Sequence, residues 1–267
     1  MSEEMIRYDG EESEDVLYAK YEKLLFQKAE VKKEALHWEM EYNREFGDEL
    51  LLVFKEKIEC IRLKKTIGYC QMFINRGEQI NTDVMNEYIQ TAMLEYTKRL
   101  HKLIEEVDMA KGGTEIGRSS VRKIKQIYRC LAKKIHPDIC PLTMRNEELS
   151  DLWMDLTEAY ETNNLDWMEE IEAMINNILE GYDLEGIDYE VPDIGGRIEK
   201  LTAEIVKITN SEPYIYSELL IDKEQVEAKH KALKKELEEY RTYNNSLQEM
   251  LDKLMGSGGG GFVWQMN

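Results

Sequence analysis

The chain has 267 residues, a formal net charge of −19 and charged side chains at 33% of its positions. Its 16 glycines and only 4 prolines leave few chain breaks, which favours long helices. The longest apolar run, Leu50 to Phe54, is far too short to span a bilayer, and the acidic start MSEEMIRYDGEESED has no hydrophobic signal region. We therefore expect an all-α, elongated protein that is cytoplasmic and has no membrane partner.

Candidate metal ligands and catalytic groups are sparse. The cysteines lie about ten or more positions apart, so no CxxC pair exists, and they are Cys60, Cys70, Cys130 and Cys140. His37 and His101 have no His or Cys at the third or fourth position after them. The carboxylates are evenly spread, and no nucleophile motif or phosphate-binding loop is present. We expect no metal, no cofactor and no catalytic residue, which makes an enzyme the least favoured class.

Helical patterns fill the chain after an acidic stretch, residues 1–12, that we expect to be disordered. A seven-residue rhythm of apolar positions then indicates a long helix, which Gly47 is expected to kink or end. A second helix should cover Leu50 to Ile74, and a third should cover Met85 to Ala110. Three helices with short joints predict an antiparallel N-terminal bundle over residues 13–110.

The next stretch is a basic amphipathic helix that ends in the tripeptide His136-Pro137-Asp138, called here the HPD loop. Pro137 disfavours the helical conformation at the residue before it and removes a backbone donor, so the helix has to end at His136. Seven cations and no acid lie between Ile116 and Pro137. In so acidic a chain, this cationic face predicts an acidic surface as its partner rather than a merely solvated face.

A second amphipathic helix follows the HPD loop, with an apolar stripe from Leu149 to Tyr160. Two such helices joined by a loop predict an antiparallel helical hairpin. The apolar faces of its two helices should meet, while the basic face and the HPD loop point outward into solvent.

This hairpin resembles the J-domain of DnaJ-type co-chaperones. The resemblance falls within residues 111–180 and is to a J-domain-only type, expected to be bacterial, with extra helical and coiled-coil regions. The residues that carry it are Tyr128-Arg129, Leu131-Ala132, His136-Pro137-Asp138 and, in the following helix, Ala159-Tyr160.

The resemblance implies that the chain binds the ATP-bound state of a DnaK-type chaperone and stimulates its ATP hydrolysis. The HPD loop, His136, Pro137 and Asp138, would contact the junction between the partner's nucleotide domain and its linker. The basic helix would lie on an acidic surface of that partner. The partner-binding residues implied on the helix are Arg122, Lys125, Tyr128, Arg129 and Lys133.

The sequence departs from the family pattern in three places. Ile139 and Cys140 follow the HPD loop, where the family usually has a basic residue and often Asn. An acidic segment, residues 165–172, stands where the family has a basic cluster. The usual first-helix pattern is not recognisable before Gly112, so the helix from Met85 to Ala110 is its expected replacement.

Residues 181–196 are rich in Gly and Asp and form the expected linker to a C-terminal coiled coil, residues 197–255. Apolar positions alternate by four and three from Val226 to Leu254, after a shorter stripe from Ile198 to Ile208. The region either folds back as an antiparallel coiled-coil hairpin or forms a homodimer through the long helix.

Two polar residues, His230 and Asn244, fall in the seam of this coil, where we expect them to fix the register. The tail, residues 256–267, is a Gly-rich tether that ends in an aromatic peptide. It is either a cloning scar or a short linear ligand.

Two other functional classes remain open from the sequence. One is a coiled-coil scaffold or interaction protein with a vestigial J-domain. The other is an RNA- or ribosome-associated factor that uses the basic helix, although the net charge of −19 and the lack of interleaved aromatic residues disfavour nucleic acid as a partner. For the co-chaperone function, the helical regions outside the hairpin are expected to recruit the protein to a site or client.

Overall fold

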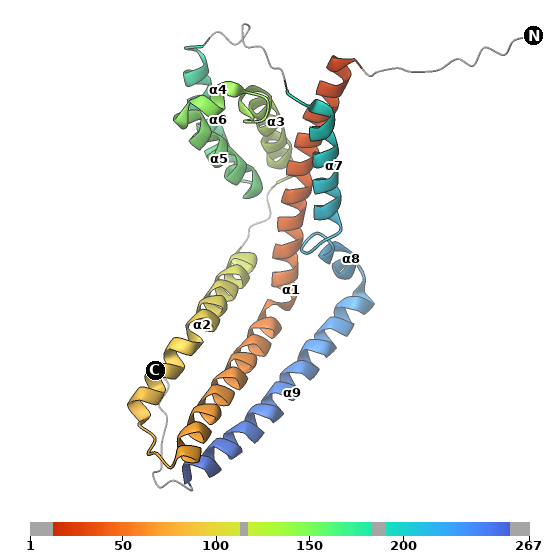
Figure 1. Cartoon of the computed structure of the whole chain (residues 1–267). Helices are drawn as coiled ribbons and strands as arrows, with labels where there is room; N and C mark the ends of the chain where they lie inside the picture. Colours follow the sequence, from red (N-terminus) through yellow and green to blue (C-terminus); the bar gives the residue numbers. More distant parts are fainter. Residues whose placement is uncertain (1–12, 113–116, 183–190, 257–267) are drawn as a thin grey trace, which may run out of the picture. The chain divides into compact units, whose positions relative to one another are not determined.

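The computed structural model describes residues 13–112, 117–182 and 191–256, and within these ranges every regular element is a helix (Figure 1). The predicted all-α class is therefore confirmed. None of the described helices combines the length and the apolar character that crossing a membrane requires. The helices are α1 (Glu14–Arg76), α2 (Thr82–Gly112), α3 (Arg118–Ile135), α4 (Pro141–Arg145), α5 (Glu147–Glu161), α6 (Leu165–Leu179), α7 (Ile194–Thr209), α8 (Tyr216–Ile221) and α9 (Lys223–Gly256).

Some predictions concern residues that lie outside the described ranges. These are the disordered start at residues 1–12, the central part of the linker at residues 183–190, and the tail at residues 257–267.

The chain divides into two compact units, and α1 contributes to both. The first unit contains residues 1–39 and 114–215, and the second contains residues 40–113 and 216–267. This division differs from the one expected from sequence, which kept residues 13–110 in one bundle and 197–255 in one coiled coil. The reason is that helical periodicity reveals an apolar face without identifying the segment that covers it.

Gly47 does not end the first helix, which continues without interruption from Glu14 to Arg76. The prediction of two separate helices before the first turn was therefore wrong. Gly47 instead permits close packing on α2, because a Cβ atom at this position would lie only 2.7 Å from Cγ2 of Val107. The absent side chain therefore serves helix packing and not chain reversal.

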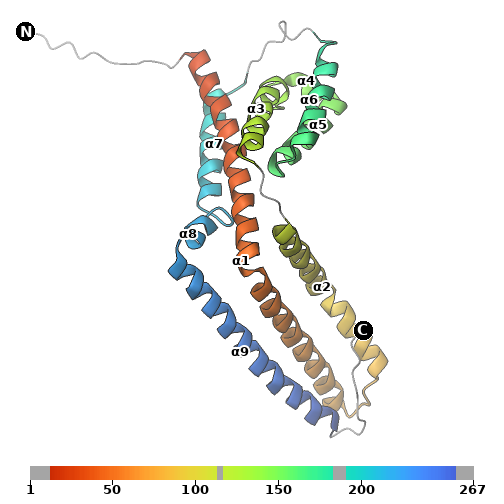
Figure 2. The same cartoon turned by 180° about the vertical axis from the view of Figure 1, so that it is seen from behind.

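In the second unit, the later part of α1 lies between α2 and α9 (Figures 1 and 2). The helix α2 is antiparallel to α1, since Cys70 near the end of α1 contacts Met85 at the start of α2, with their sulfur atoms 3.7 Å apart. The helix α9 is parallel to α1. Its Leu233 and Leu237 pack against Phe46 and Val53, so the seam predicted for a coiled coil closes within the chain, on α1.

The two polar seam residues of α9 both pair with glutamates of α1. His230 places Nδ1 2.6 Å from Oε2 of Glu49. The side-chain amide of Asn244 donates to the backbone oxygen and to Oε2 of Glu56, each at 2.9 Å. These directional contacts match only one alignment of α9 along α1, as expected of polar groups that set a register.

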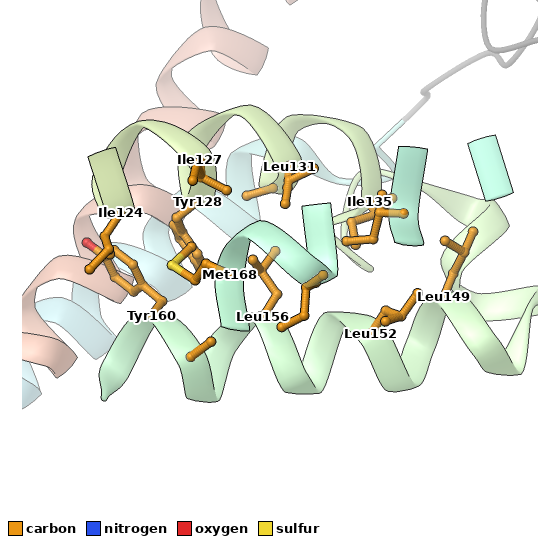
Figure 3. Packing of buried hydrophobic residues seen from close by; sticks show 14 of the residues in the cluster. Ile124, Ile127, Tyr128, Leu131, Ile135, Leu149, Leu152, Leu156, Tyr160 and Met168 are labelled. Atoms are coloured by element: carbon orange, nitrogen blue, oxygen red, sulfur yellow. The ribbon is translucent and has the colours of Figure 1, made fainter. Parts of the chain in front are cut away.

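The first unit is centred on α3, α5 and α6, whose apolar side chains point toward one another (Figure 3). The helices α3 and α5 form the predicted antiparallel hairpin. Tyr128 in the middle of α3 stacks on Tyr160 near the end of α5, and His136 beyond the end of α3 contacts Trp153 in the middle of α5. The short α4, the first part of α1 and α7 complete this unit. The apolar contact between α1 and α7 is formed by Leu17, Tyr21, Leu25, Ile194, Ile198 and Leu201.

Candidate functional site

The HPD loop is held in a tight turn directly after α3. The His136 amide donates to the backbone oxygen of Ala132 at 2.9 Å, which closes the last turn of the helix. The Ile139 amide then donates back to the His136 oxygen at 3.0 Å. The buried Thr143 hydroxyl donates to the backbone oxygen of Ile135 at 2.8 Å, so a carbonyl that the helix end would leave unpaired is satisfied. The loop is therefore fixed by its own backbone and by the Thr143 side chain of α4.

His136 is half-buried, and its ring is positioned from two sides. Its edge lies against the Trp153 indole, with ring centroids 4.6 Å apart. The Asp138 amide donates to Nδ1 of His136 at 3.0 Å, so the proton of the neutral ring belongs on Nε2. Burial lowers the His136 pKa to about 4, although the Asp138 charge partly opposes this shift. The loop was expected to be exposed, but only Asp138 is.

The Asp138 carboxylate is faced by residues of α1 and α7. The Tyr21 hydroxyl donates to Oδ2 of Asp138 at 3.3 Å. The Arg197 guanidinium lies near both groups, and its interaction with Tyr21, together with the Asp138 charge, raises its pKa. The most accessible group of the HPD loop therefore already has a donor and a cation beside it.

Tyr128 is the one predicted partner-binding residue that lies in the core. Its side chain is 5% exposed, and its ring stacks on Tyr160 at a centroid distance of 4.0 Å. Burial raises the pKa of its hydroxyl above the ordinary value. Tyr128 therefore supports the hairpin from inside. The position of Tyr128 in the apolar stripe of the basic helix already indicated that its side chain would be buried.

The cations of α3 that were predicted to bind a partner are largely paired with acids of α1. Glu30 Oε1 lies 2.9 Å from Nη2 of Arg129 and 3.4 Å from Nζ of Lys125. Glu22 Oε1 lies 2.7 Å from Nζ of Lys133. Arg122, in contrast, is exposed and has no ion pair with any residue that the structure describes. Three of the four cations predicted to bind a partner are therefore engaged within the chain.

The element that packs beside the hairpin is the first part of α1. The sequence-based choice, residues 85–110, was wrong, because α2 belongs to the second unit. Phe26 and Ala29 of α1 contact the hairpin core. Lys33 donates to the backbone oxygen of Tyr160 at 2.6 Å and lies 3.9 Å from the centre of its ring, and burial lowers its pKa to about 8.

A signal for this packing is visible in the sequence in retrospect. Residues 22, 26, 30 and 33 are spaced by four, four and three, so they share one face of α1 and alternate acid, Phe, acid and Lys. Such a face complements a basic amphipathic helix. Apolar periodicity alone, which guided the expectation, does not register it.

Two hollows separate α1 from the hairpin. The larger is an open groove of about 810 Å³ whose lining includes Ala19, Glu22, Phe26, Glu30, Arg129 and Lys133. The smaller, about 180 Å³, is lined in part by Leu25, Lys28, His136, Asp138, Trp153 and Tyr160. Beside the larger hollow, the ion pairs of Arg129 with Glu30 and of Lys133 with Glu22 bridge α1 and α3.

No three His, Cys, Asp or Glu side chains in the described part of the chain converge as ligands of one metal ion. No family model matches the chain, and searches of curated proteins and of solved structures also found no match. The functional argument therefore starts from the geometry of the hairpin.

Proposed function

We propose that this protein is a J-domain co-chaperone that binds a DnaK-type chaperone and stimulates its ATP hydrolysis. The observation that carries the proposal is the position of the HPD loop. It forms a fixed turn at the tip of an antiparallel hairpin, directly after a helix with a cationic outer face. The proposed docking surface consists of the HPD loop and the cations Arg122, Lys125, Arg129 and Lys133.

The two parts of the docking surface would have different tasks. Cations on a helix surface accelerate association with an acidic partner and fix its orientation, but they discriminate poorly between partners. The HPD loop supplies shape and direction. Pro137 restricts the backbone, and the exposed Asp138 carboxylate can accept a two-fold hydrogen bond from a partner's arginine. Specific recognition would therefore come from the loop.

The neutral state of His136 supports a role in shaping the loop. Its Nδ1 accepts from the Asp138 amide, and its ring lies on Trp153. Glutamine has a similar length but neither the ring nor the same acceptor geometry. His136→Gln would therefore leave the hairpin core intact and change the conformation of the loop.

The direct test is the single-turnover ATPase rate of a DnaK-type chaperone. Wild-type protein should accelerate hydrolysis, and His136→Gln should not. The control is His101→Gln, the same substitution at an exposed position on α2 in the second unit, which should behave as wild type. Circular dichroism should show equal helix content for all three proteins.

The absence of stimulation by any of these folded proteins would contradict the proposal and favour the scaffold alternative. Binding to RNA with a steep salt dependence would favour the nucleic-acid alternative instead. Within the proposal, the activity belongs in the cytoplasm, and the helical regions outside the hairpin would recruit a client or target protein.

A further inference from the structure

We infer that the first part of α1, residues 14–39, is an autoinhibitory cover over the docking surface, which the chaperone has to displace. The inference rests on the proposed function and concerns the regulation of the same site. It is drawn from contacts within the first unit alone.

The cover contacts the residues that the proposal assigns to the partner. Glu30 pairs with Lys125 and Arg129, and Glu22 pairs with Lys133, whose Nζ is 2.7 Å away. A carboxylate of a partner would have to compete with these glutamates for the same cations. The first part of α1 thus presents to α3 the kind of acidic surface expected of the chaperone.

The same competition occurs at the HPD loop. The Tyr21 hydroxyl donates to the Asp138 carboxylate, and the charge of Arg197 acts on both groups. If a partner's arginine is to pair with Asp138, this internal arrangement has to open. The first part of α1, which packs on α7, therefore contacts both the cations and the HPD loop.

Ile139 provides a separate, apolar anchor for the cover. It directly follows the HPD loop and is only 4% exposed. Its neighbours belong to α1 and α7 and not to the hairpin core; they are Tyr21, Leu25, Ile198 and Leu201. An apolar side chain at this position therefore ties the loop to the cover.

The hairpin does not depend on the cover for its own core. All buried residues of its central cluster come from α3, α5 and α6 (Figure 3), and α1 adds only the partly buried Phe26 and Ala29. The cover is held otherwise by the Ile139 anchor, by Lys33 and Tyr21, and by partly exposed ion pairs. The ion pairs are individually weak and are screened by salt, and they lie beside an open groove of about 810 Å³. The cover can therefore detach while the hairpin stays folded.

With a cover of this kind, the apparent affinity for the partner equals the intrinsic affinity multiplied by the fraction of molecules in which the cover is open. If one molecule in about ten is open, the apparent affinity for the partner is about tenfold below its intrinsic value. Weakening the cover should recover that factor without changing the docking surface itself.

The test compares full-length wild-type protein with Glu22→Lys/Glu30→Lys. The control, Glu14→Lys/Asp15→Lys, makes the same change in net charge on the same part of α1, at exposed residues with no ion pair among the described residues. We expect the first variant to reach half-maximal stimulation of the chaperone ATPase at about tenfold lower concentration, and the control to match wild type. Equal half-maximal concentrations for all three proteins would refute the cover and leave the proposed function standing.

A second measurement needs no chaperone. The Ile139 side chain packs on α1 and α7, so a cysteine at this position reports on the cover independently of the loop's own hydrogen bonds. Ile139→Cys, followed by tandem mass spectrometry, should react with a thiol reagent about tenfold faster when combined with Glu22→Lys/Glu30→Lys than when alone or combined with the control pair. The exposed Cys130 should react equally in all three proteins. If no protein stimulates the ATPase, the proposed function fails, and the labelling result still decides whether α1 covers the loop. Equal labelling at position 139 would refute the cover.

Discussion

The imidazole of His136 meets the indole of Trp153 edge-on, with ring centroids 4.6 Å apart. A ring on α5 therefore helps to set the charge state of the His136 ring, which lies just beyond the end of α3. Burial of the imidazole beside the indole disfavours its protonated form and lowers its pKa to about 4.

We predict that acid destabilises the first unit through His136. Its pKa is lower in the folded chain than in the unfolded chain, so the unfolded state takes up the proton first as the pH falls from about 6.5 to about 4. The free energy of unfolding should fall across this window by up to about 3 kcal/mol from this residue. A nuclear magnetic resonance titration of the His136 ring checks this. A midpoint near the ordinary value would contradict it, and Trp153→Ala should move the midpoint up toward that value.

We predict the opposite pH dependence for His230 in the second unit. Hydrogen bonds to Glu49 and Glu45 raise its pKa in the folded chain. The contribution of charged His230 to the free energy of unfolding is complete below the ordinary histidine pKa. It is lost as the pH rises through the raised pKa of the folded chain. Chemical denaturation at about pH 6 and about pH 9 should show this loss in wild type and a smaller loss in His230→Gln. An equal loss in both proteins would mean that the two glutamates do not stabilise the charged ring.

Two glycines of α1 should respond to alanine with opposite signs. At Gly47 a Cβ atom would lie 2.7 Å from Cγ2 of Val107, so Gly47→Ala should destabilise the second unit by about 1–3 kcal/mol. A Cβ atom added at Gly68 would meet no atom within 4 Å apart from its own stretch of helix. Gly68→Ala should therefore stabilise the helix by about 0.5–1 kcal/mol. Thermal unfolding compares the two. Adding Val107→Ala should relieve the clash at Gly47, and a failure to do so would place the strain elsewhere.

Neighbouring positions on α5 should separate the core of the hairpin from its surface. Leu156 is fully buried among α3, α5 and α6, so Leu156→Ala should cost about 2–5 kcal/mol. Met154 is 60% exposed, and Met154→Ala should change stability by less than about 0.5 kcal/mol. The measurement is the denaturation midpoint of each variant. Similar effects of the two substitutions would contradict the assignment of the core.

Much of the hairpin was predictable because its signals are local. Apolar spacing placed Leu131, Leu149 and Leu156 on facing sides of two helices, and Pro137 set the end of the first helix. The charge of α3 and the position of the HPD loop were equally readable. The half-buried state of His136 was not, because it depends on Trp153, which a turn and a further helix separate from it in the sequence.

The sequence by itself determined the all-α class, the end of α3 at the HPD loop and the apolar faces of the longer helices, since these follow from backbone constraints and from residue spacing within one turn or two. Only the tertiary structure decided which faces meet. It joined α9 to α1, and it laid Glu22 and Glu30 against the cations of α3. The physical reason is that an apolar or charged stripe specifies only what kind of surface covers it. Several helices in this chain present such a surface, and the choice among them depends on the packing of a whole unit.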